Sequence, residues 1–180
     1  MLMAQVLTVK QILKFAPCWD LADVRKAVGN GITIGQLLDR VWARYGEEIF
    51  SPIDCIWLLT RDNVLPLSVH ARVTELIVTR CIRKYVVGTA IDHWAQGWLN
   101  GSDRSFDAAN NAYRIPCNLS FSALCAIRAA MDASHRIACG TAYTGGSAAN
   151  AVGRIGTAND VTVEYELQLL DFRTAIEEYK

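Results

Sequence analysis

The sequence predicts an all-α fold: a single compact bundle of about seven to nine helices around a central helix at residues 69–87. That central run contains neither Pro nor Gly, and its apolar residues recur at helical spacing on more than one side. Shorter segments with the same spacing lie before and after it, separated by clusters of Gly, Pro and Asn. Only residues 161–163 have a strand-like composition, and three such residues do not predict a sheet.

Four helices are predicted before the central one, at residues 8–15, 19–28 and 34–45 and from Pro52 to a stop at Asp62-Asn63 before Pro66. Asp20 and Asp23 lie in the first turn of the second helix, where carboxylates suit the helix dipole. Thr33 is placed to cap the third helix. Ser51-Pro52 is the clearest start signal in the chain, because Ser is a preferred N-cap and Pro a preferred first helical residue.

The central helix is predicted to begin after Ser68 as its N-cap. Its apolar residues form two stripes: Val69, Val73, Leu76, Ile77 and Cys81 in one, and Val78, Ile82 and Tyr85 in the other. Gly88-Thr89 then permits a bend. A helix with two apolar stripes needs packing partners on more than one side, so we place it at the centre of the bundle.

The second half of the chain predicts helices at residues 90–99, 103–113, 120–138, 147–155 and 161–179. The segment 120–138 is rich in alanine, and such small side chains let neighbouring helices approach closely. Residues 140–146 are expected to form a loop. Asn159-Asp160 is expected to cap the last helix.

Composition bounds the class of protein. At 180 residues and 52% hydrophobic, the chain fits one domain spanning residues 1–180 with a substantial core. Lys plus Arg and Asp plus Glu are 18 each, which argues against nucleic acid and anionic membrane as partners and leaves a homo-oligomer open. No apolar run reaches about 18 residues, and no signal peptide is apparent, so we expect a cytoplasmic protein without a membrane span.

Cysteine and histidine form no recognisable metal or catalytic motif. The six cysteines show no CxxC spacing, so we expect buried free thiols in preference to a disulfide framework. His70, His93 and His135 do not form an HExxH motif. The Gly-rich run 140–156 lacks a preceding strand and a following Lys, which favours a helix connection, or a binding loop at Gly145-Gly146-Ser147, over a phosphate site. We therefore expect no metal and no cofactor.

Two helices carry opposite charges. Arg72, Arg80, Arg83 and Lys84 make the central helix locally basic, whereas the last helix contains Glu164, Glu166, Asp171, Glu177 and Glu178. These groups either pair within the domain or remain for a partner. For a partner, the predicted contact residues are Asp171, Glu177 and Glu178. Trp42 and Trp57 are expected in the core, and one of Trp94 and Trp98 is expected as an interface anchor.

Trp42 is followed by an acidic spacer and then by the run Asp54-Cys55-Ile56-Trp57-Leu58-Leu59. This arrangement resembles the opening of a family of helical immunity proteins found beside bacterial toxins and in phages, with Cys55 replacing an aromatic residue of the family's run. Residues 90–101 and 120–138 are similar to later segments of the same family. The resemblance covers most of residues 15–180 and rests on packing motifs.

The resemblance implies a protein partner, either a toxin or another effector, that is blocked by occlusion. We therefore expect a non-enzymatic protein-binding module, either an immunity-type protein or a phage-borne inhibitor of a toxin, nuclease or host-defence effector. Two alternatives stay open. One is an enzyme whose Cys/His or metal site is assembled from distant residues. The other is a self-assembling structural protein, favoured by the near-zero net charge and the pair Trp94 and Trp98.

Overall fold

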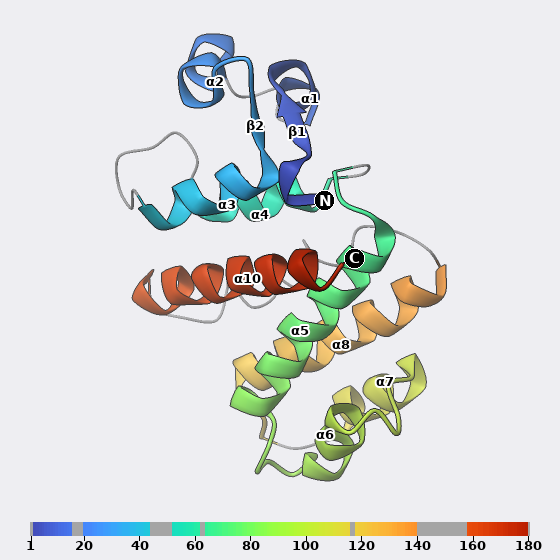
Figure 1. The fold of residues 1–180 in the computed structure, drawn as a ribbon. Coiled ribbons are helices and arrows are strands. Elements are labelled where there is room, and N and C mark those ends of the chain that lie inside the picture. Colours follow the sequence, from blue (N-terminus) through green and yellow to red (C-terminus); the bar gives the residue numbers. More distant parts are fainter. Residues whose placement is uncertain are drawn as a thin grey trace.

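The computed structural model describes residues 2–15, 20–43, 52–61, 64–115, 118–139 and 158–179. These residues form nine α-helices, one short 3-10 helix and a two-stranded sheet, so the predicted all-α multi-helix fold is confirmed (Figure 1). The loop predicted at 140–146, the helix predicted at 147–155 and the side chains of Trp42 and Trp57 lie outside the described part of the chain.

The elements fall into two groups along the chain. The first group is η1 (Leu2–Ala4), β1 (Val6–Thr8), α1 (Val9–Phe15), α2 (Leu21–Val28), β2 (Gly31–Thr33), α3 (Ile34–Ala43) and α4 (Pro52–Leu59). The second group is α5 (Leu67–Tyr85), α6 (Asp92–Leu99), α7 (Phe106–Arg114), α8 (Phe121–Cys139) and α10 (Ala158–Glu178). Every one of these α-helices contributes at least one buried apolar residue to the core.

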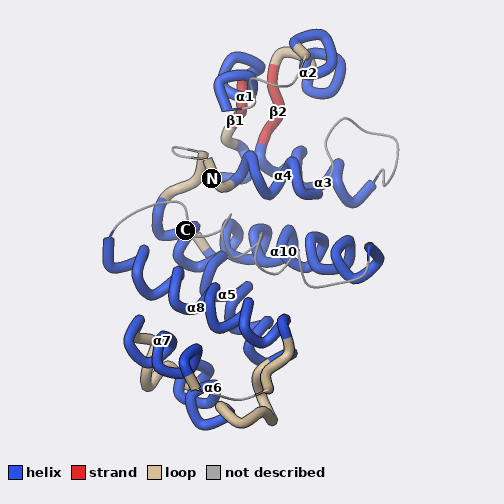
Figure 2. Tube along the Cα trace, turned by 180° about the vertical axis from the view of Figure 1, so that it is seen from behind, coloured by secondary structure: helices blue, strands red, loops and turns tan. Residues whose placement is uncertain are grey.

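Helix α5 has the central position that its two apolar stripes predict. It packs against α8, α10 and α6, while α7 packs against α8 (Figure 1). Helix α10 lies between α5 and α4 and therefore joins the two groups of elements. Helices α1 and α2 project from the body at the end farthest from α6 and α7, as both views show (Figures 1 and 2).

The two-stranded sheet was not predicted. Strands β1 and β2 are antiparallel and pair Val6 with Thr33, Leu7 with Ile32 and Thr8 with Gly31. A Cβ atom at Gly31 would lie 2.9 Å from Val6 Cγ1, so glycine permits the close approach of the strands. Each strand has only three residues, too few for alternation to be recognised in the sequence. Residues 161–163, expected to be the most strand-like, lie in α10.

Both strands lead directly into a helix through a capping threonine. The Thr8 hydroxyl accepts a hydrogen bond from the Gln11 backbone N–H at 3.3 Å, and the Gln11 side chain accepts in return from the Thr8 backbone N–H at 2.9 Å. Thr33 and Gln36 repeat this arrangement at the start of α3, at 3.1 and 3.0 Å. The predicted cap at Thr33 is confirmed, and both helix starts are stabilised by a capping box.

The predicted N-cap at Ser68 is wrong. Helix α5 begins at Leu67, and Pro66 is its N-cap, in extended conformation and without a side-chain cap bond. The Pro66 carbonyl accepts hydrogen bonds from the backbone N–H groups of Val69 and His70. Proline fixes φ near the value that the helix start requires, and this backbone preference prevails over the side-chain preference of Ser68. Helix α10 likewise begins before the expected cap at Asn159-Asp160.

Small residues bring α8 close to α5 and α7, as its composition predicts. The alanines that are fully buried along it are Ala123, Ala126, Ala129, Ala130 and Ala133. The expectation of free thiols is confirmed for Cys55 and Cys81, which are buried, and for Cys125, which is partly buried. The side chains of Cys18, Cys117 and Cys139 lie outside the described residues.

Candidate functional site

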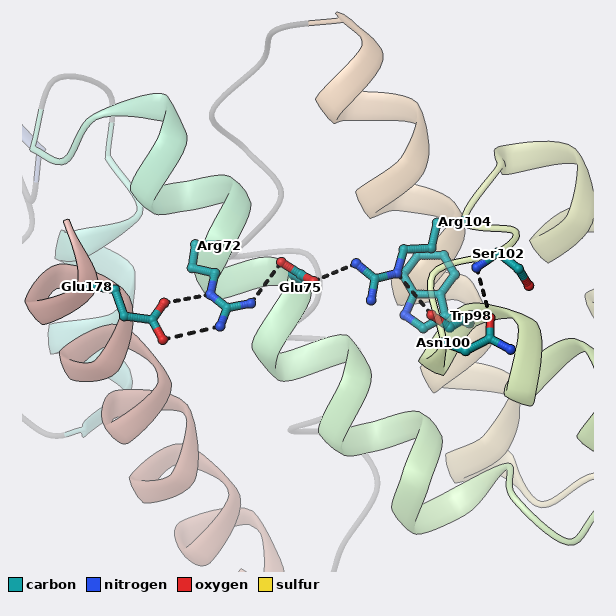
Figure 3. A network of polar contacts seen from close by, with 7 residues as sticks. All are labelled: Arg72, Glu75, Trp98, Asn100, Ser102, Arg104 and Glu178. Carbon is teal, nitrogen blue, oxygen red and sulfur yellow. Dashed lines mark hydrogen bonds and ion pairs between the residues drawn. The ribbon is translucent and has the colours of Figure 1, made fainter. Parts of the chain in front are cut away.

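Arg72 and Glu75 of α5 are the centre of an ion-pair network (Figure 3). The Arg72 guanidinium donates to Glu178 of α10 through Nε at 2.7 Å and Nη2 at 3.2 Å, and to Glu75 through Nη1 at 3.0 Å. The other carboxylate oxygen of Glu75 accepts from Arg104 Nη1. Each carboxylate oxygen of Glu75 therefore accepts a hydrogen bond from a different arginine, and Glu75 connects α5 to the α6–α7 connection.

Arg104 extends the network into the connection between α6 and α7. Its Nε donates to the Trp98 carbonyl at 2.9 Å, and its guanidinium lies 6.0 Å from the centroid of the Trp98 ring. The Ser134 hydroxyl of α8 donates to the Arg104 carbonyl at 2.6 Å. Asn100 accepts from the Ser102 backbone N–H at 2.8 Å in the same connection (Figure 3). One network thus links α5, α6, α8 and α10.

Electrostatics in this network favour the charged form of each carboxylate. Burial alone would raise the pKa of Glu75, but the hydrogen bonds from Arg104 and Arg72 outweigh it and lower that pKa below its usual range. The hydrogen bond from Arg72 also lowers the pKa of Glu178. The same contacts raise the pKa of Arg72. Glu75 and Glu178 are therefore ionised at neutral pH.

Replacing Glu75 with glutamine should make the free energy of unfolding less dependent on pH below about pH 5. A carboxyl group whose pKa is lower in the folded chain stabilises it above the unfolded pKa, and this stabilisation is lost as pH falls through the folded value. We expect wild-type stability to fall from about pH 5 downward, and E75Q to lose about 1 kcal/mol at pH 7 but to fall less steeply below pH 5. Urea unfolding at several pH values measures both effects. The exposed Glu177→Gln is the matched control, and parallel curves for E75Q and wild type would contradict the assignment.

The basic and acidic helices pair within the chain. Arg80 Nη2 of α5 lies 2.9 Å from Asp171 Oδ2 of α10, and Glu178 of α10 pairs with Arg72. Arg173 of α10 also pairs with Asp39 of α3. Of the predicted partner-binding residues, Asp171 and Glu178 therefore form ion pairs with α5, and Glu177 and Glu178 are exposed. That these three residues contact a partner remains a prediction.

The remaining sequence candidates are dispersed or buried. His70 is buried in α5, His93 is exposed, and the side chain of His135 lies outside the described residues. Within the described ranges, no three His, Cys, Asp or Glu side chains come together as a metal site, and no helix is long and apolar enough to cross a bilayer. The expected interface anchor among the tryptophans is wrong for Trp98, which is 2% exposed, and Trp94 packs against the core beside it.

Exposed apolar side chains flank the connection between α7 and α8. Tyr113, Ile115 and Phe121 are all exposed, and Phe121 is exposed by 61%, the largest value among the exposed large apolar side chains of the described residues. Arg114 is exposed between them. We call these four residues the α7–α8 corner. Helices α7 and α8 pack closely against each other.

Sequence reasoning missed the α7–α8 corner, because residues 103–113 were expected to form a short polar helix. One signal was available: the chain contains no acidic residue between Asp107 and Asp132. Protein interfaces are enriched in aromatic residues and Arg and depleted in Asp and Glu. Comparison of the chain with protein-family models, curated proteins and solved structures gave no match.

Proposed function

We propose that this chain is a non-enzymatic protein-binding module that acts in the cytoplasm and contacts its partner through the α7–α8 corner. In its finer form, the proposal is an immunity-type or phage-borne inhibitor that occludes a toxin, a nuclease or a host-defence effector. The observation that carries the proposal is the exposure of Tyr113, Ile115 and Phe121 around one helix connection. Scattered exposed apolar residues are normal on proteins, but aromatic residues gathered beside an Arg are typical of interfaces.

The packing behind the corner supports this proposal. Ala109 and Ala112 of α7 and the alanines of α8 are buried, so the two helices meet through small side chains. The large side chains at the end of the pair are therefore not needed to fill the space between the helices. A rigid pair that presents Tyr113, Arg114 and Phe121 loses little side-chain entropy when a partner covers it. Occlusion of an effector requires only such a preformed surface.

Charge introduced at Phe121 should abolish partner capture. Tagged wild type, Phe121→Asp and Leu67→Asp would be used as baits in lysate of the native host, with quantitative mass spectrometry of the captured proteins. Leu67 is a matched control, because it is also the first residue of its helix and is 55% exposed. We expect one protein at near-equal stoichiometry with wild type and L67D, and a loss of at least about tenfold with F121D, since a charge is costly in a desolvated interface centre.

Capture that is the same for all three baits would contradict the assignment of the corner. Recovery of the bait alone would instead point to self-association, which the equal numbers of acidic and basic residues favour. Light scattering over a range of protein concentrations distinguishes this case. A mass that rises with concentration in wild type and L67D, but not in F121D, would show that a second copy occupies the corner.

A further inference from the structure

Helices α1 and α2 form a lobe that projects from the body of the molecule (Figures 1 and 2). The two helices pack against each other and against strands β1 and β2. Ile12, Val24 and Val28 are buried inside the lobe, so it has a small apolar interior of its own. We call the described residues 6–15 and 20–33 the α1–α2 lobe.

Four basic side chains are exposed on this lobe: Lys10, Lys14, Arg25 and Lys26. Lys10 and Lys14 are four residues apart and therefore lie on the same side of α1. Arg25 and Lys26 lie in the last turn of α2, where the helix dipole favours positive charge. This attraction leaves the side-chain N–H groups available for hydrogen bonds. With Asp20 and Asp23 the only acidic residues among residues 6–33, the lobe has a net charge of +2, in a chain whose total is zero.

Four arginines of the body are held in ion pairs. Arg72, Arg80, Arg104 and Arg173 each pair with a carboxylate of another element or turn. The side chains of the four lobe cations form no ion pair and no hydrogen bond with any residue in the described part of the chain. The lobe therefore presents positive charge outward.

We propose that the α1–α2 lobe docks an acidic protein segment. This proposal goes beyond the contact at the α7–α8 corner, because the lobe lies at the opposite end of the molecule (Figure 1). The complementary charge of the lobe selects an anionic partner, and its other side chains select a protein in preference to nucleic acid. An acidic helix or loop would neutralise the four cations and pack against exposed apolar side chains of the lobe.

Two features oppose a phosphate backbone as the occupant. The Asp20 carboxylate caps the N-terminus of α2 and accepts from the Ala22 backbone N–H at 2.6 Å, and Asp23 lies in the same turn. The backbone N–H groups at the N-terminus of α2, which a phosphate could bind, are therefore already capped. Leu21, which is 43% exposed, and the exposed Val6 offer apolar contacts that a protein side chain can use and a phosphate cannot.

Fluorescence anisotropy with defined probes tests the proposal. The first probe is a labelled helical peptide of about 20 residues, with glutamates on one side and two leucines four positions apart. A second peptide has serines in place of the leucines, and a third probe is a single-stranded or duplex DNA of the same length. Binding is measured at about 50 mM salt, where exposed charges are incompletely screened.

The leucine peptide should bind wild type, and both K10E/K14E and R25E/K26E should weaken it by about tenfold or more. The matched control is R83E/K84E, which reverses another adjacent basic pair in the last turn of a helix and should leave the affinity within about twofold. The leucine peptide should bind about threefold more tightly than the serine peptide, and Leu21→Ser should remove that difference. Circular dichroism of each variant confirms that it is folded.

Peptide binding that is insensitive to both lobe double variants would overturn the proposal, as would equal weakening by R83E/K84E. Tighter binding of DNA through the same four residues would replace an acidic protein with nucleic acid as the occupant. Failure of the F121D experiment does not affect this test, because no residue of the α7–α8 corner is changed in it. The two proposals can therefore fail separately.

Discussion

Replacing Phe172 with alanine should lower the free energy of unfolding by about 3–5 kcal/mol. Phe172 has no exposed surface and is among the largest fully buried side chains of the described residues. It lies on α10, which packs against both α4 and α5. The truncation removes the apolar contacts of the ring and leaves a cavity that the surrounding helices fill only in part, so both terms reduce stability.

Urea unfolding followed by circular dichroism measures this loss as a lower midpoint at an unchanged slope. Leu170→Ala is the matched control, because Leu170 is two residues away on the same helix and is 47% exposed. Its truncation should change stability by less than about 0.5 kcal/mol. If F172A and L170A lowered the free energy of unfolding equally, the face of α10 that contains Phe172 would not be the face that packs against the core.

Replacing Trp98 with alanine should also cost about 3–5 kcal/mol, whereas Trp98→Phe should cost less than about 1.5 kcal/mol. The Trp98 ring is buried, lies 6.1 Å from the Trp94 ring between centroids, and underlies the Arg104 guanidinium. Its indole N–H has no hydrogen-bond partner among the described residues. Phenylalanine therefore restores most of the packing and gives up no hydrogen bond.

Thermal and urea unfolding of W98A and W98F give the two losses, and Trp94→Phe controls for the other ring of the pair. The distinction between the two substitutions at Trp98 is the informative result. If W98F were as destabilising as W98A, the indole N–H would have to donate a hydrogen bond that phenylalanine cannot make. A small loss for both would mean that the ring does not fill the space between α6 and its neighbours.

Helical periodicity carried most of the fold prediction. The two apolar stripes of residues 69–87 placed α5 at the centre of the bundle, and the alanines of residues 120–138 indicated the close contact that α8 makes with its neighbours. Both signals are local and repeat over many residues. The cap at Thr33 was also predictable, because a capping box involves only a residue and the one three positions later.

The candidate surfaces were harder to predict, because exposure is a property of the folded chain. The sequence showed a basic helix and an acidic helix but could not decide whether they meet. Asp171 and Arg80 are 91 residues apart, and only the packing of α10 against α5 brings them together. The same packing pairs Glu178 with Arg72.

By itself, the sequence determined the helical class of this protein, its central helix and the positions of most helix starts. These features depend on side-chain spacing and on hydrogen bonds between residues close in the chain. Only the tertiary structure decided the pairing of β1 with β2, the neutralisation of α10 by α5 and the exposure of Phe121. Those features depend on contacts between distant residues, whose formation is governed by the packing of the whole core and not by any local pattern.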